Sequence, residues 1–226
     1  MTRKDGYRNL FSFYLGLKSM PTNILNDTNL EELIENKSVD VIYEIFCFFS
    51  IVNILSDIYK VDSKQLKYNV DKDEFKKSLS KENNKNCFIF KRNDNFPKIK
   101  VHYNKTYTNP FSYSKSFDPD ISIEIFNEND YLKSIYIFDA KFKVNINKDN
   151  NLKENKKYKY DDITKMHAYK DAILLVQGAF ILYPGSKNEV YRENTSIKNS
   201  VGAFNLNINN IDEQTLIKEV IIKLLI

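Results

Sequence analysis

The feature that most constrains the fold is a change of hydrophobic period near residue 87 of this 226-residue chain. Before it, apolar residues recur at helical spacing, and residues 38–59 predict a long, mostly buried helix with Ser38 as its N-cap. After it, short β-rich runs alternate apolar with polar residues, as half-buried strands do. This order predicts an α/β domain with a mixed β-sheet flanked by helices.

The predicted elements follow one another without an internal repeat or a linker. Further helices are expected at residues 5–19, near 30–35, at 72–80, from Asp161 or Asp162 to about Gln177, and at the C-terminus, where Leu216, Val220 and Leu224 share a face. Strands are expected at residues 87–92, 98–103, 120–126, 134–144, 178–185 and 201–207, with a polar loop at 145–160. We therefore expect a single domain over residues 1–226, mainly helical in 1–80, with a sheet core in 87–226.

Composition limits which partners the chain can bind and in which compartment it can lie. Apolar residues make up 42% of it, which is enough for a sizeable core, and a net charge of +4 permits a polyanionic partner without requiring one. The most hydrophobic stretch, residues 41–55, is shorter than a bilayer span and carries Glu44, so it predicts a buried helix and no membrane segment. Cys47 and Cys87 lie in apolar runs, which favours two buried thiols over a disulfide. Together with a charged N-terminus, this predicts a cytoplasmic protein.

Two neighbouring predicted strands carry acidic residues on one face. In residues 120–125 the isoleucines alternate with polar residues, so Asp120 points away from the apolar face. In residues 136–144 the same period places Asp139 and Lys141 on one face. A polar turn joins the two strands, which predicts a hairpin in which Asp120 and Asp139 converge.

Two converging carboxylates repel each other unless a cation lies between them or one is protonated. Mg²⁺ prefers oxygen ligands, and Asp120, Asp139 and the backbone carbonyl of Ala140 supply a partial shell of them. Lys141, on the same face, is placed to orient a water molecule or to stabilise charge on a phosphate. The set is sufficient for phosphodiester hydrolysis.

Pro119-Asp120 followed by Asp139-Ala140-Lys141 resembles the signature of the PD-(D/E)xK nuclease superfamily. More of the chain resembles the nuclease domain of McrC-like restriction-system proteins, in order from about Gly6 to Gly185. The segments that carry this wider resemblance are GYR at 6–8, IYEIF around Glu44, KMHAY at 165–169 and YPG at 183–185.

The resemblance implies a restriction-endonuclease-like core and an Mg²⁺-dependent DNA endonuclease, with Mn²⁺ as a substitute ion. It also implies that Glu44, from an early helix, joins the metal site and that Lys165 faces it. McrC-like proteins work with an AAA+ nucleotide-hydrolysing motor in restriction or phage defence, so we expect such a partner. Cutting both DNA strands usually needs two active sites, which leads us to expect a homodimer or an assembled complex. Because McrC-like proteins carry a region before the nuclease part, the chain is expected to be a fragment or a short stand-alone version.

Several alternatives remain open from the sequence. The chain could be a catalytically silent, nuclease-like module for DNA binding or assembly, or a nuclease acting on RNA or on branched or single-stranded DNA. Glu124 is as well explained by an exposed strand charge as by a site role. Lys165 and Tyr169 share a helix face that could simply be solvated. His167 is interpreted as structural or as a minor phosphate contact.

A basic loop next to the proposed site would contact phosphates or would simply be solvated. Its lysines are Lys143, Lys148, Lys153, Lys156, Lys157 and Lys159. Other chemistries fit poorly: the glycines do not form a nucleotide-binding loop, no GxSxG or HExxH motif is present, and the histidines and cysteines lack zinc-ligand spacing.

Overall fold

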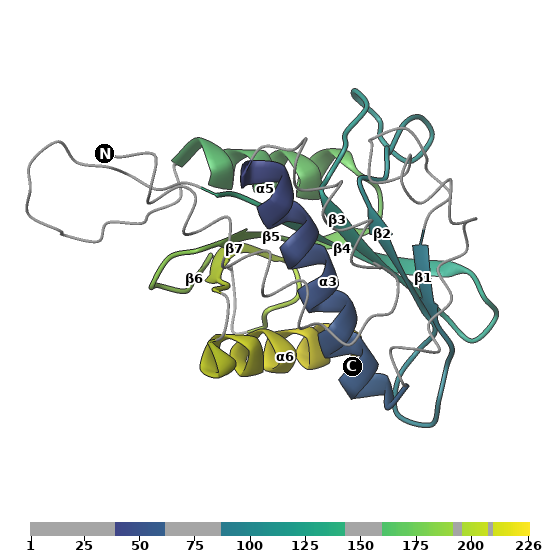
Figure 1. The fold of residues 1–226 in the computed structure, drawn as a ribbon. Coiled ribbons are helices and arrows are strands. Elements are labelled where there is room, and N and C mark those ends of the chain that lie inside the picture. Colours follow the sequence, from purple (N-terminus) through teal and green to yellow (C-terminus); the bar gives the residue numbers. More distant parts are fainter. Residues whose placement is uncertain (1–38, 62–86, 143–159, 192–195, 208–209) are drawn as a thin grey trace, which may run out of the picture.

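A seven-stranded mixed sheet forms the centre of the computed structural model, which describes residues 39–61, 87–142, 160–191, 196–207 and 210–226 (Figure 1). Its strands lie in the order β1-β2-β3-β4-β5-β7-β6. The first four are antiparallel, β4, β5 and β7 run parallel, and β6 returns antiparallel at the edge. Their bounds are β1 Cys87–Phe90, β2 Ile99–Tyr103, β3 Ile121–Phe126, β4 Leu132–Ala140, β5 Val176–Tyr183, β6 Glu189–Tyr191 and β7 Ser200–Asn205.

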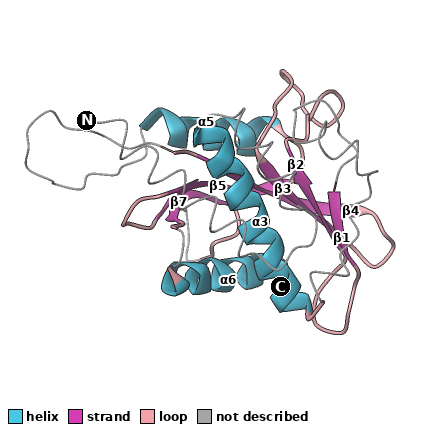
Figure 2. Cartoon of the chain, in the orientation of Figure 1, coloured by secondary structure: helices cyan, strands magenta, loops and turns pink. Residues whose placement is uncertain are grey.

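Helices cover both faces of this sheet. The bounds of the helices in the described ranges are α3 Val39–Tyr59, α5 Tyr160–Ala172 and α6 Ile211–Leu225. Helices α3 and α6 share one hydrophobic core with the sheet, and α5 packs on the opposite face over a second core (Figure 2). The predicted α/β architecture, a mixed sheet flanked by helices as in restriction endonucleases, is therefore confirmed.

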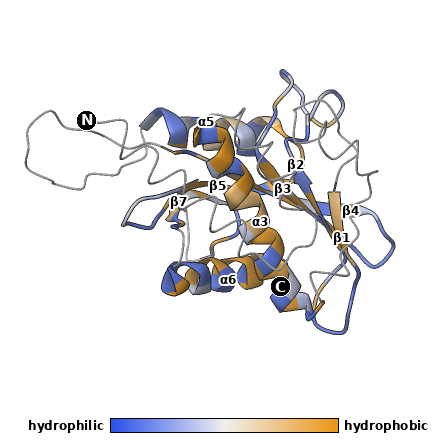
Figure 3. Cartoon of the chain, in the orientation of Figure 1, coloured by the Kyte–Doolittle hydropathy of each residue, from blue (hydrophilic) through white to orange (hydrophobic). Residues whose placement is uncertain are grey.

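Helix α3 is a core helix. Its length and hydropathy would allow it to cross a membrane, yet 78% of its most apolar window is buried within the protein. It is apolar on nearly all sides, unlike the surface helix α5 (Figure 3). The prediction that residues 41–55 belong to a buried helix is confirmed. Cys47 and Cys87 are both buried and free, also as predicted.

Strand β4 is buried on both faces and separates the two cores. Tyr136, Phe138 and Ala140 face the core under α3, whereas Ile135 and Ile137 face the core under α5. Asp139 continues the second series, so it is the charged residue in a row that is otherwise apolar. The predicted hairpin of β3 and β4 is present, with Ile121 opposite Phe138.

The boundary between α5 and β5 differs from the prediction. Helix α5 ends at Ala172 rather than near Gln177, and Leu175 has a positive φ of 68°. Val176 already pairs with Ile135 of β4, so parallel sheet pairing overrides the helical continuation. Strand β6 was not predicted, because it has only three residues and lies in a stretch that is otherwise polar. It lies close to Gly202, where a Cβ would be 2.5 Å from the Glu189 carbonyl oxygen.

Other predictions fall outside the described residues. These are the helices at 5–19, near 30–35 and at 72–80, the Ser38 cap, and the basic loop. Of the loop predicted at 145–160, the structure describes Tyr160, which begins α5. The division into a helical part and a sheet core thus stays a prediction for residues 1–38 and 62–86.

A substitution at Phe180 would test the packing of the hydrophobic core. It is fully buried, and its ring centroid lies 5.5 Å from that of Phe138 and 5.3 Å from that of Phe204. We expect Phe180→Ala to lower the free energy of unfolding by about 3–5 kcal/mol, because it leaves a cavity. Urea denaturation measures this, with Tyr131→Ala as the control, since Tyr131 is 71% exposed and should change stability by less than about 0.5 kcal/mol. Equal effects of both changes would contradict the packing described here.

Candidate active site

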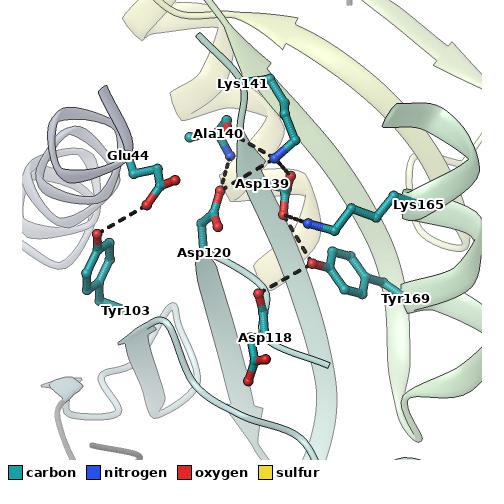
Figure 4. A network of polar contacts seen from close by, with 9 residues as sticks. All are labelled: Glu44, Tyr103, Asp118, Asp120, Asp139, Ala140, Lys141, Lys165 and Tyr169. Atoms are coloured by element: carbon teal, nitrogen blue, oxygen red, sulfur yellow. Dashed lines mark hydrogen bonds and ion pairs between the residues drawn. The ribbon is translucent and has the colours of Figure 1, made fainter. Parts of the chain in front are cut away.

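A cleft of about 850 Å³ opens at the end of β4. Its walls come from α3, from the segment that connects β2 to β3, and from α5. Glu44, Asp120, Lys141 and Lys165 all line it. The structure therefore brings the predicted site residues together around one cleft, from four separate parts of the sequence (Figure 4).

The pair of strands β3 and β4 positions the two aspartates. Asp120 directly precedes the Ile121–Phe138 pair, and Asp139 directly follows it on the other strand. Asp139 is fully buried and Asp120 is 8% exposed. The Ala140 N–H donates to Asp120 Oδ2 at 2.8 Å, which fixes one carboxylate against the strand that carries the other. The predicted convergence of Asp120 and Asp139 is confirmed.

Two lysines neutralise Asp139. Lys141 Nζ forms an ion pair with Asp139 Oδ2, lies 4.0 Å from Asp120 Oδ2 and donates to the Ala140 carbonyl at 3.2 Å. Lys165 Nζ donates to Asp139 Oδ1 at 3.0 Å from the first half of α5. Lys165 is thus directed at the site, although its side chain remains 43% exposed.

Tyr169, for which a solvated helix face remained an open alternative, is buried beside Asp139. Its hydroxyl donates to Asp139 Oδ1 at 3.2 Å and lies 3.4 Å from the Asp118 carbonyl oxygen. The residue is 1% exposed, and the Lys165 ammonium stands 5.1 Å from its ring centroid. The i, i+4 spacing from Lys165 was the available signal, since it places both side chains on one face of α5.

Glu44 reaches the cleft from the opposite side. It lies in the second turn of α3, half-buried, and accepts a hydrogen bond from the Tyr103 hydroxyl at 3.4 Å. In Figure 4 its carboxylate points toward Asp120. Helix α3 therefore directs Glu44 into the cleft.

Burial and charge set the protonation of this cluster. Burial raises the pKa of the Asp120 carboxyl well above its ordinary value, and the negative charges of Asp139 and Glu44 raise it further. Burial lowers the pKa of Lys141, but the charges of Asp139 and Asp120 outweigh it and raise that pKa overall. Lys141 is accordingly a firmly charged cation, whereas Asp120 is a carboxylate that lacks enough positive charge around it.

The donor atoms fit a hard divalent cation. Two carboxylates and the Ala140 carbonyl offer oxygen ligands, and an added positive charge would relieve the repulsion that acts on Asp120. Within the described ranges no three His, Cys, Asp or Glu side chains are grouped closely enough to enclose a metal ion. Glu44 therefore does not complete a cage with the aspartates. Two carboxylates and one carbonyl leave the remaining ligand positions of such a cation to water.

Glu124 belongs to a different, buried network. It is 4% exposed, accepts from His102 Nε2 at 3.1 Å and from the Tyr107 hydroxyl at 3.2 Å, and forms an ion pair with Lys105. Burial opposes its ionisation, but these partners prevail and hold the pKa of Glu124 at about 2. Its interpretation as an exposed strand charge is wrong, and Glu124 does not line the cleft. His167 lies exposed on α5.

A mixed sheet with a crossover helix, and with two carboxylates and a lysine at the end of its central hairpin, defines a class of domains that act on phosphodiesters. The chain belongs to the PD-(D/E)XK nuclease superfamily, whose family model matches residues 41–188, more than half of its length. The match covers Glu44, both aspartates, Lys141 and Lys165. Searches among curated proteins and among solved structures gave no significant match. Superfamily membership implies a nuclease that acts on DNA and, as is typical of these proteins, uses divalent metal ions.

The raised pKa of Asp120 makes a prediction about stability without metal. Because the folded protein holds a proton that the unfolded chain releases near its ordinary pKa of about 4, wild-type stability should fall as the pH rises from there toward the raised value. Asp120→Asn removes the charge and keeps an acceptor for the Ala140 N–H. We expect its melting temperature to match the wild type near about pH 4 and to exceed it by several degrees near about pH 8.

Thermal unfolding in a chelating buffer measures this difference. The control is Asp130→Asn, which alters an exposed carboxylate in the turn after β3. A gap between Asp120→Asn and wild type that does not change with pH would contradict the assigned charge state.

Proposed function

We propose that the chain is an Mg²⁺-dependent endonuclease that hydrolyses phosphodiester bonds in DNA. The observation that carries the proposal is the convergence of Asp120 and Asp139 at adjacent strand ends, with the charged Lys141 beside both. Electrostatic stabilisation by such preorganised charges is a large part of phosphoryl-transfer catalysis.

Each residue's proposed role follows from its position in the cleft. Lys141 keeps its charge and, at the rim of the cleft, would contact a non-bridging phosphate oxygen or orient the attacking water. Lys165 is partly exposed and would neutralise the phosphate as it enters. Tyr169 holds Asp139 in place through its hydroxyl, and Tyr103 does the same for Glu44.

Asp120, Asp139 and the Ala140 carbonyl would hold the divalent cation, with Glu44 assisting from α3. When bound, the cation supplies Lewis-acid stabilisation of negative charge on the phosphate. Mn²⁺ is expected to substitute, because it accepts the same oxygen ligands.

The proposed setting is a McrBC-like restriction or phage-defence system in the cytoplasm. An AAA+ motor subunit would bring DNA to the nuclease, and a homodimer or assembled complex would supply the second active site for a double-strand break. The proposal rests on the resemblance of residues 6–185 to McrC-like nuclease domains.

A catalytically silent DNA-binding or assembly module is the rival function. The observation in its favour is that two lysines already neutralise Asp139, which would lower its need for a cation. The two functions differ in one measurable property, the response of DNA cleavage to divalent metal.

Removal of either charge at the centre of the site should abolish activity. We expect Asp139→Ala and Lys141→Ala each to reduce Mg²⁺-dependent plasmid cleavage by about 100-fold or more, because each contributes directly to charge stabilisation. The assay compares the variants with wild type in Mg²⁺, in Mn²⁺ and in chelator, with and without a candidate motor subunit. Asp130→Ala and Lys98→Ala are matched controls, since this ion pair lies on the surface at the other end of the hairpin.

Cleavage that survives both site substitutions would refute the assigned residues. A folded wild type that neither cleaves nor binds metal under any of these conditions would favour the silent module.

Loss of the Tyr169 hydroxyl should have a smaller effect. Tyr169→Phe keeps the buried ring against Phe117 and removes the hydrogen bond to Asp139. We expect kcat to fall by about tenfold with little change in KM, because a loosened carboxylate affects the transition state more than substrate binding. Steady-state kinetics on a fluorescent oligonucleotide measure both constants. A variant indistinguishable from wild type would remove Tyr169 from the site.

A further inference from the structure

The connection between β2 and β3 is much longer than the turn that two paired antiparallel strands need. The two strands are antiparallel neighbours in which Tyr103 pairs with Ile121, so a turn of about two to five residues would join them. Instead, residues 104–120 leave the sheet and rise beside the C-terminal end of α5 (Figure 1). Long hairpin loops of this kind usually serve a function.

This connection is firmly held. The Tyr107 N–H donates to the Phe117 carbonyl at 2.8 Å and the Phe117 N–H returns to Tyr107 at 3.0 Å, which closes residues 108–116 into a loop. Its tip bridges to the turn after α5, where the Leu174 N–H donates to the Phe111 carbonyl at 2.8 Å. We call residues 108–116 the α5-anchored loop.

The α5-anchored loop displays aromatic rings to solvent. Phe111 is 47% and Tyr113 60% exposed, while Ser112 between them is buried and bridged to Ile173. The Tyr113 hydroxyl is hydrogen-bonded to Asp171, so the ring is held in place rather than left to rotate. Aromatic rings held outward at fixed positions are available to stack on the bases of a nucleic acid.

The same loop leads directly into the cleft. Lys115 at its end lines the cleft, exposed, with its ammonium 5.1 Å from the Phe117 ring centroid. Phe117 and Asp118 continue the cleft wall up to Asp120. A strand whose phosphate lies at the aspartates would therefore pass Lys115 and then meet the two rings.

We infer that Phe111 and Tyr113 stack on unpaired bases of the DNA strand that enters the cleft, so that the enzyme prefers DNA with single-stranded segments to fully paired duplex. The inference rests on the proposed function and narrows its substrate. Aromatic side chains bind single strands by stacking without regard to sequence, and a lysine beside them tracks the backbone. In a paired duplex the faces of the bases are already stacked on one another.

A protein partner is a weaker explanation of the same surface. Stable protein interfaces bury roughly 800 Å² on each side, whereas this patch consists of two separated rings and the half-exposed Leu174 and Leu175. Its continuity with a cleft for phosphates favours a nucleic acid.

Binding measured without cleavage tests the inference. Fluorescence anisotropy in chelator would give the Kd for a labelled single strand and for the same strand annealed to its complement. We expect the double change Phe111→Ala with Tyr113→Ala to weaken single-strand binding by about tenfold or more and to leave duplex binding within about twofold. Tyr113→Phe, which keeps the ring but loses the hydrogen bond to Asp171, should retain most of the single-strand binding. Tyr131→Ala is the matched control, because Tyr131 is exposed in the turn at the far end of the β3–β4 hairpin.

The outcomes separate this inference from the proposed function. Selective loss of single-strand binding supports stacking even if no condition produces cleavage, in which case the catalytic proposal alone fails. Equal losses on both substrates, no loss in the double variant, or no single-strand binding by folded wild type would overturn the inference. So would self-association of the wild type in sedimentation that the double change removes while single-strand binding persists, since the rings would then join two copies of the chain.

Discussion

Two carboxylates held side by side in a protein interior repel each other. The groups around Asp120 and Asp139 offset that repulsion. The pairing of β3 with β4 forces the two together, and the Ala140 N–H prevents Asp120 from turning away. Counter-charge reaches Asp139 from Lys141 directly after the strand and from Lys165 on the crossover helix. Asp120 receives less of it, and burial together with the negative charges of Asp139 and Glu44 raises its pKa.

The parts of this arrangement that depend on local geometry could be predicted from the sequence. A period of two fixes the faces of β3 and β4, so the convergence of Asp120 with Asp139 followed once the polar turn indicated a hairpin. The helix around Glu44 was equally clear, because its apolar run is too long and too continuous for a strand. The positions of Glu44 and Lys165 came from family resemblance, since no local pattern says which way a helix face will point across a cleft.

The parts that depend on contacts between distant segments could not be predicted. Helix α5 stops early because Val176 pairs with β4. The short edge strand β6 forms where Gly202 of β7 leaves room for the Glu189 carbonyl. Glu124 reads as an exposed charge in the alternating pattern of β3, yet buried partners on β2 and the segment after it keep it ionised. The role of Tyr169 stayed open for the same reason, because its hydroxyl meets Asp139 only where α5 lies over that strand.

The proposed catalytic groups and the proposed substrate-binding loop lie on different parts of the fold. The aspartates and Lys141 lie on or directly beside strands that are buried on both faces, where a change of position would disturb two cores at once. The α5-anchored loop leaves and rejoins the sheet between paired strands, so its exposed tip can vary without shifting the register that holds the carboxylates. Because Lys115 and Asp118, which follow that tip in the chain, line the cleft, the proposal implies that a change at the rings would alter which strand reaches the aspartates and would leave the aspartates and Lys141 in place.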